Sequence, residues 1–133
     1  MEPAEVMIVH LDTSVLVDAL TGRRRALPAL KRAVTEGHVL AWSSLVLYEW
    51  LRGPRVAAEL EDQAALLPAT EARSFGPVEA ARAAHVYPEL KRARGRDMDI
   101  AIAACALEHG AHLWTLNPDD FRDIPALRLY EPG

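Results

Sequence analysis

The stretch VMIVHLDTSVLVD, residues 6–18, decides the fold of this chain. The apolar run that opens it has the composition of a strand that is covered on both faces. This run ends at Asp12, and the next two residues, Thr13 and Ser14, are residue types that cap helices. The pattern predicts a buried strand that leads directly into a helix. Ligands of open α/β sheets bind at the carboxyl ends of strands, so Asp12 is a candidate site residue, although capping the helix would explain it equally well.

Size and composition predict a single domain over residues 1–133. Half of the residues (50%) are hydrophobic, which is enough for a sizeable core. No run approaches the roughly 18 apolar residues of a membrane span, and the start MEPAE lacks the basic residues of a signal peptide. We therefore expect a cytoplasmic protein. The single cysteine, Cys105, lies in the apolar segment IAIAACAL, which favours a buried residue over a nucleophile or a disulfide partner.

The formal net charge of −4 argues against a protein that coats nucleic acid through bulk positive charge. Basic residues nevertheless gather in clusters that can concentrate positive charge on one face, and solvated helix flanks are the alternative explanation for each cluster. The clusters are Arg23 to Arg25, Lys31 with Arg32, Arg52 with Arg55, and Lys91 to Arg96.

Helix and strand patterns alternate along the rest of the chain. The apolar spacing predicts helices over 26–36, 45–51, 55–67, 77–92 and 97–109, with Pro88 interrupting the fourth, and strands over 39–42, 70–75, 112–116 and 127–130. Residues 91–96, KRARGR, read as a basic loop. Alternating strands and helices imply right-handed crossovers, and hence a mainly parallel sheet with helices on both faces.

Acidic residues occupy two unexpected places in these helices. Glu49 interrupts the apolar run LVLYEWL, where an acid is out of place unless it faces a partner, a metal or water; a salt bridge to Arg52 is the alternative. Asp97 and Asp99 open a helix that is otherwise apolar nearly all round. Favourable interaction with the helix dipole is the alternative explanation for this pair.

These acids can meet at one edge of the sheet. If the strand over 112–116 neighbours the first strand, Asp12, Asp99 and the turn at Asn117 converge, and Glu49 can reach them. Carboxylates held close together repel one another, so such a cluster is tolerable mainly when a cation neutralises it. Oxygen ligands select Mg²⁺ or Mn²⁺ over zinc, and the five histidines form no HExxH motif.

Four motifs occur in order along the chain: LDTS at 11–14, Ser43 six residues before Glu49 with Gly53 following, DIAIAACA at 99–106, and WTLN at 114–117 with Phe121. Together they resemble the PIN domain, and within it the VapC toxins of bacterial and archaeal toxin–antitoxin pairs. The resemblance covers essentially the whole chain. It implies a three-layer α/β/α sandwich around a mainly parallel sheet, and Mg²⁺- or Mn²⁺-dependent endoribonuclease activity.

By position, the resemblance implies that Asp12, Glu49 and Asp99 are the catalytic and metal-binding acids. The fourth acidic position of the family falls on Asn117, a neutral metal ligand whose lower charge leaves open whether a second ion binds. The candidate supporting residues, which would add charge or orient the acids, are Asp97, Asp120, Thr13, Ser14, Ser43 and Thr115.

The implied reaction is metal-assisted hydrolysis of RNA phosphodiester bonds by an activated water that attacks in line. Phosphate contacts would come from the basic loops, chiefly Arg52, Arg92, Arg94, Arg96 and the cluster at 23–25. The resemblance also implies a cognate antitoxin protein that blocks the site, and a homodimer. The apolar residues Leu45, Leu47, Leu51 and Val56 are a candidate surface for either contact, and core packing is the alternative.

Two other functions compete with this interpretation. A catalytically silent PIN-like module would bind RNA or protein without cutting, and loss of the acids would mark it. A phosphoryl-accepting receiver or phosphatase would also place an aspartate after the first strand, but LDTS lacks the second aspartate of the DxD phosphatase pattern. Fold analogy alone licenses none of these functions, so the acids have to decide.

Overall fold

The computed structural model describes residues 5–133; residues 1–4, which are most of the MEPAE start, lie outside the described part. Three strands form a parallel sheet in the order β2-β1-β3. They are β1 (Ile8–Leu11), β2 (Val39–Ala41) and β3 (His112–Trp114). The helices are α1 (Thr13–Leu20), α2 (Leu27–Thr35), α3 (Ser44–Arg52), α4 (Ala57–Leu66), α5 (Pro77–Val86) and α6 (Asp97–Glu108). Three short 3-10 helices occur between these elements or after β3: η1 (Ala69–Glu71), η2 (Tyr87–Glu89) and η3 (Pro118–Asp120).

The first strand is the centre of the sheet, as its apolar composition predicts. Val9 pairs with Leu40 on one side and with His112 on the other. The expected adjacency of the first strand and the strand near residue 112 is therefore confirmed. Since all three strands are parallel, the segments that follow them leave from the same edge, where α1 begins after β1 and α3 begins after β2.

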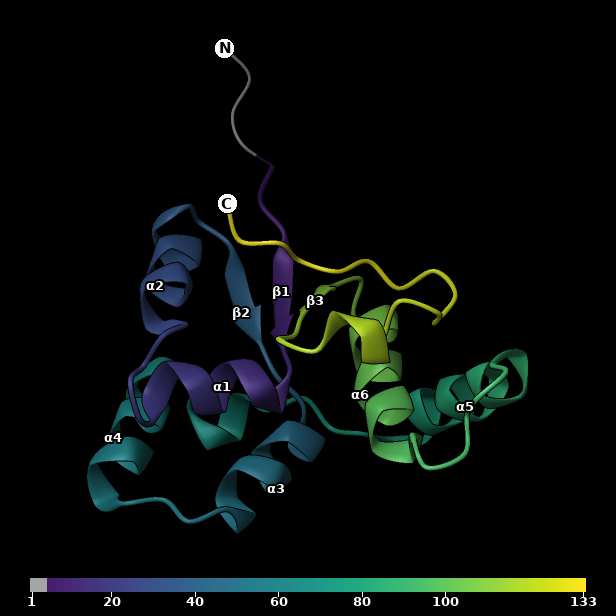
Figure 1. The fold of residues 1–133 in the computed structure, drawn as a ribbon, viewed down its shortest axis with the longest axis horizontal. Helices are drawn as coiled ribbons and strands as arrows, with labels where there is room; N and C mark the ends of the chain where they lie inside the picture. Colours follow the sequence, from purple (N-terminus) through teal and green to yellow (C-terminus); the bar gives the residue numbers. More distant parts are fainter. Residues whose placement is uncertain (1–4) are drawn as a thin grey trace.

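Helices flank the sheet, which confirms the α/β class. Figure 1 shows α2 and α4 to one side of the strands and α5 and α6 to the other. The run of alanines in α6 is buried, as are Trp42 and Trp50, so the core continues from the sheet into the helices. No helix within residues 5–133 has both the length and the apolar character that crossing a membrane requires.

Two predicted strands are wrong. Residues 70–75 form the turn η1 and then a single bridge between Ser43 and Arg73, and residues 127–130 contribute only a bridge between Leu113 and Leu129. Both segments touch the edge of the sheet at one point, since turns and prolines on either side leave no room for a longer ladder. The predicted helix over 77–92 ends at Val86, where η2 with its proline follows.

One buried polar residue of β1 faces the core instead of the acidic edge. His10 is completely buried, and its ring stacks on that of His109 with the centroids 6.1 Å apart. Burial, then the positive charges of His109 and Arg73, lower the pKa of His10 from 6.5 to about 3. His10 is therefore neutral at neutral pH, and it serves as a core residue.

Candidate functional site

Asp12 follows β1 directly and is buried, with 6% of its surface exposed. Its Oδ2 accepts hydrogen bonds from the hydroxyl groups of Ser14, at 2.9 Å, and Thr115, at 2.7 Å. These hydroxyls are fixed in turn, because Ser14 Oγ accepts the backbone N–H of Leu116 and Thr115 Oγ1 accepts that of Asn117, each at 3.0 Å. Asp12 makes no side-chain bond that caps α1. The turn after β3 therefore orients the carboxylate, and two of the four predicted supporting hydroxyls, those of Ser14 and Thr115, contact it.

Glu49 reaches the same edge from α3. The hydroxyl of Thr13 donates a hydrogen bond to Glu49 Oε1 at 2.7 Å. Glu49 Oε2 lies 3.7 Å from Nη2 of Arg52, and the Glu49 side chain is 20% exposed. The salt bridge to Arg52 and the bond to the segment that follows β1 are thus both present. Because Thr13 and Asp12 are adjacent in the chain, this bond ties the first two acids together.

Asp99 lies in the first turn of α6 and is partly buried. The pKa of Asp99 rises from 3.8 to about 6, first because of burial and then because of the negative charges of Asp12, Asp120 and Glu49. Arg96 acts in the opposite direction. Coulomb effects of this kind require short range, so the three family acids and Asp120 gather at one edge of the molecule.

Two predicted supporting residues take other places. Ser43 is fully buried, and its Oγ accepts the backbone N–H of Val46 at 3.3 Å, so it caps α3 as its sequence position predicts. Asp97 lines a hollow against α5 together with Phe75 and Tyr87. Positions two apart on a helix point in different directions, which explains why Asp97 and Asp99 face different surroundings.

The arginines predicted to bind RNA differ in whether they already pair with acidic residues. Arg96 donates hydrogen bonds to both carboxylate oxygens of Asp123, at 2.8 and 2.7 Å. Asp123 had no signal in the sequence, because it lies 27 positions away from Arg96 in a turn. Arg52 is shared with the acidic site, whereas Arg92 and Arg94 are exposed.

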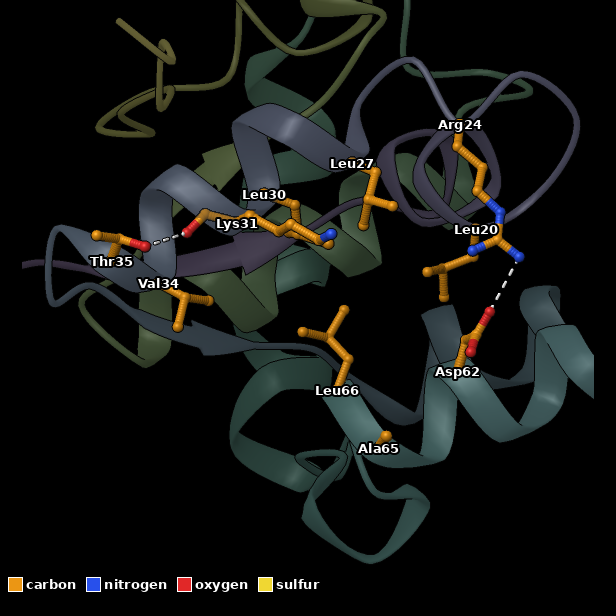
Figure 2. Close-up of a pocket in the computed structure, with 10 residues that line it drawn as sticks. All are labelled: Leu20, Arg24, Leu27, Leu30, Lys31, Val34, Thr35, Asp62, Ala65 and Leu66. Carbon is orange, nitrogen blue, oxygen red and sulfur yellow. Dashed lines mark hydrogen bonds and ion pairs between the residues drawn. The ribbon is translucent and has the colours of Figure 1, made fainter.

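A separate apolar groove of about 600 Å³ lies between α1, α2 and α4 (Figure 2). Leu20, Leu27, Leu30, Val34 and Leu66 provide most of its apolar lining. An ion pair between Arg24 and Asp62, 3.0 Å long, crosses one end. None of the three family acids lines this groove.

The acidic edge has the donor chemistry of a divalent-metal site. Within residues 5–133, no three acidic, histidine or cysteine side chains are gathered closely enough to ligate one ion in their present positions. Asp12, Glu49, Asp99 and Asp120 offer carboxylate oxygens only, which suits Mg²⁺ or Mn²⁺ better than zinc. The raised pKa of Asp99 reflects repulsion that a cation would relieve. Side-chain rotation would have to close these carboxylates on an ion.

Comparison with known proteins agrees with this geometry. The family model of the PIN domain matches residues 9–127. The chain therefore belongs to the PIN-domain family, whose nucleases generally use divalent metal ions. No curated protein sequence matches the chain significantly.

Several solved structures share the fold over nearly the whole chain. A toxin–antitoxin complex from Klebsiella pneumoniae is 26% identical, with a TM-score of 0.70, covering 94% of this chain and 98% of that one. VapBC2 from Rickettsia felis is 24% identical, with a TM-score of 0.73 and coverage of 93% and 98%. VapBC from Salmonella typhimurium is 20% identical, with a TM-score of 0.77 and coverage of 96% and 100%. The resemblance to the PIN domain that the motifs indicate is confirmed by the family match, and these structures share its fold.

Proposed function

We propose that the chain is a metal-dependent endoribonuclease and the toxin component of a type II toxin–antitoxin pair. The observation that supports this proposal is that Thr13, next to Asp12, donates a hydrogen bond to Glu49, and that the negative charges of Asp12, Asp120 and Glu49 act on Asp99. Likeness to VapC-type complexes supports the toxin role. Retention of all three acids favours an enzyme over a silent PIN-like binding module, which would have no need to bear their mutual repulsion.

The residues around the acids hold some carboxylate oxygens and leave others for a metal ion. Ser14 and Thr115 occupy Oδ2 of Asp12, which leaves Oδ1 for an ion, and Thr13 holds Oε1 of Glu49. Asp99 and Asp120 would supply further carboxylate oxygens, and Asn117 would be a neutral ligand. When bound, Mg²⁺ or Mn²⁺ would supply the positive charge that polarises a phosphate and makes water more acidic. The protein's contribution is to hold Asp12 and Glu49 by hydrogen bonds at one edge, where the other acids can close on the ion.

Cleavage should require the metal ion. The purified chain, freed of any partner, is expected to cut a pool of transfer and ribosomal RNA in 1 mM Mn²⁺ at least on the order of a hundredfold faster than in excess EDTA. Gel electrophoresis with end-labelled RNA measures the rate. Equal cleavage in Mn²⁺ and EDTA would contradict the proposal, and so would the absence of cleavage in Mn²⁺.

An antitoxin is the proposed protein partner, and the groove of Figure 2 is its proposed seat. The groove is apolar and open, which suits the apolar face of a helix better than it suits RNA. Lys31 lies at the groove and can pair with an acidic residue of such a helix. The contact surface predicted from the sequence is only partly exposed. Leu45 and Leu47 pack partly against the core, whereas Leu51 is 52% exposed.

A carboxylate placed in the groove should release this partner. Leu66→Asp is expected to weaken the complex with the antitoxin by on the order of tenfold to a hundredfold, because a charge would be buried against an apolar helix. Ala64→Asp adds the same charge to an exposed neighbouring position of α4 and should change affinity less than about threefold. Calorimetry of each variant with the antitoxin measures the difference. Equal weakening by the two substitutions would exclude the groove.

A homodimer is the remaining proposal. Tyr48, Leu51 and Val56 are exposed by 57%, 52% and 63% on and just after α3. Exposed apolar side chains this close in the chain support a contact with a second copy.

A further inference from the structure

A second hollow, of about 710 Å³, opens from the acidic site along α1. At one end it is lined by Ser14, which holds Asp12, and by Asn117. At the other end it is lined by Arg23 and Arg25, which lie in the loop between α1 and α2. The two ends are separated by about two turns of α1, or roughly 10 Å along the helix axis. The hollow therefore runs from Thr13 and Ser14, which hold Glu49 and Asp12, to a basic loop.

The three arginines of this loop line two different hollows. Gly22 and Arg24 both have positive φ, of +57° and +52°, so two residues of this short loop adopt the left-handed backbone conformation. Arg24 lies at the apolar groove and pairs with Asp62, as Figure 2 shows. Arg23 and Arg25 line the other hollow, and neither makes a hydrogen bond or ion pair with the rest of residues 5–133.

The basic residues on the opposite side of the site are less suited to an anion. The hollow at Arg92 and Arg96 is also lined by Asp119, Asp120 and Asp123, so carboxylates match the basic groups there. Along α1, in contrast, Asp18 is the only acidic residue that lines the hollow with Arg23 and Arg25. Of these two hollows, only the one along α1 is lined by more basic than acidic side chains.

We propose that this hollow binds the backbone of single-stranded RNA next to the cleaved bond, with Arg23 and Arg25 as its phosphate ligands. The inference rests on the proposed function and gives the substrate a direction across the molecule. Leu116, 45% exposed at the hollow, offers an apolar surface to a ribose or a base. Guanidinium groups bind phosphate without reading sequence, so these arginines should contribute affinity but little choice of sequence.

The test measures binding of a fluorescent oligouridylate to the chain in EDTA, where metal-dependent cleavage cannot interfere. The double variant Arg23→Gln/Arg25→Gln is expected to bind about tenfold more weakly at about 100 mM salt, and to lower the slope of log affinity against log salt by about 1.4, since each phosphate contact on a single strand contributes roughly 0.7. Arg24→Gln is the control, because it removes one positive charge from the same loop at a side chain that lines the apolar groove instead. It should change binding less than about twofold.

The outcomes separate this inference from the proposed function. Equal weakening by Arg24→Gln and by the double variant would mean a diffuse charge effect and would overturn the inference. Unchanged binding by the double variant, in a chain that still cuts RNA with Mn²⁺, would overturn the inference alone. A wild-type chain that neither binds the oligonucleotide nor cuts RNA would overturn both.

Discussion

Asp99→Asn is expected to slow metal-dependent RNA cleavage by on the order of a thousandfold, whereas Asp97→Asn should leave the rate within about threefold. The two aspartates are matched, since both lie in the first turn of α6 and each substitution removes one charge. The negative charges of Asp12, Asp120 and Glu49 act on Asp99, whereas Asp97 lines the hollow against α5. Loss of a metal ligand removes several kcal/mol of transition-state stabilisation, and loss of a remote acid does not.

Asp12→Asn should behave like Asp99→Asn and keep the fold. The hydroxyls of Ser14 and Thr115 can still donate to the amide oxygen of an asparagine at position 12. Initial rates on one end-labelled RNA, together with circular dichroism spectra, measure activity and fold side by side. Metal-dependent cleavage that survives in both Asp12→Asn and Asp99→Asn would refute the nuclease assignment, and equal losses in Asp97→Asn and Asp99→Asn would remove its link to the acidic edge.

In EDTA at pH 7.5, Asp99→Asn is expected to be more stable than the wild type by roughly 1–2 kcal/mol, or about 3–8 °C in Tm. The pKa of Asp99 is raised by burial first and then by the neighbouring acids, from 3.8 to about 6. A raised pKa means that the folded state favours the protonated carboxyl group, so the wild type loses stability as the pH rises from about 4 to about 6 and stays penalised above it. The advantage of Asp99→Asn should therefore vanish near pH 4.

A bound metal ion should reverse the order of stability of the wild type and Asp99→Asn. In 1 mM Mn²⁺ at pH 7.5 the Tm of the wild type is expected to rise, because an ion that binds only the folded state stabilises it, and the Tm of Asp99→Asn should change little. Asp97→Asn serves as the control with the opposite sign, since losing a charge from the first turn of α6 should cost about 0.3–1 kcal/mol and leave the response to Mn²⁺ intact. Thermal unfolding at pH 4, 6 and 7.5 measures all three proteins. A metal-free Asp99→Asn that is less stable than the wild type at pH 7.5 would show that the acids do not strain the fold.

The sequence predicts the centre of the fold better than its edges. Residues 6–18 contain both the apolar run of β1 and its abrupt polar end, so strand, helix and the place of Asp12 follow from local pattern. Residues 127–130 have the same kind of apolar pattern. They nevertheless form only one bridge with β3, between Leu129 and Leu113, and no strand. Edge pairing is set by tertiary geometry that no local pattern records.

The candidate site could also be predicted only in part. The three acids could be picked out because each one interrupts an apolar pattern at the start of a helix or within it. The different surroundings of Asp97 and Asp99 could not, because both positions fit a first helical turn equally well. The bonds between Arg96 and Asp123 could not either, since they join residues 27 positions apart through a turn with no regular period.

The short loop with left-handed backbone at Gly22 and Arg24 lies between two proposed binding places, so ligands in these places would influence each other through it. One short loop supplies Arg24 to the apolar groove and Arg23 and Arg25 to the hollow along α1. A ligand in either place that shifts this backbone changes the affinity of the other place, and by linkage the two effects are equal in size. An inhibitor that never touches the acids would then change the affinity for RNA by the same factor by which RNA changes the affinity for the inhibitor.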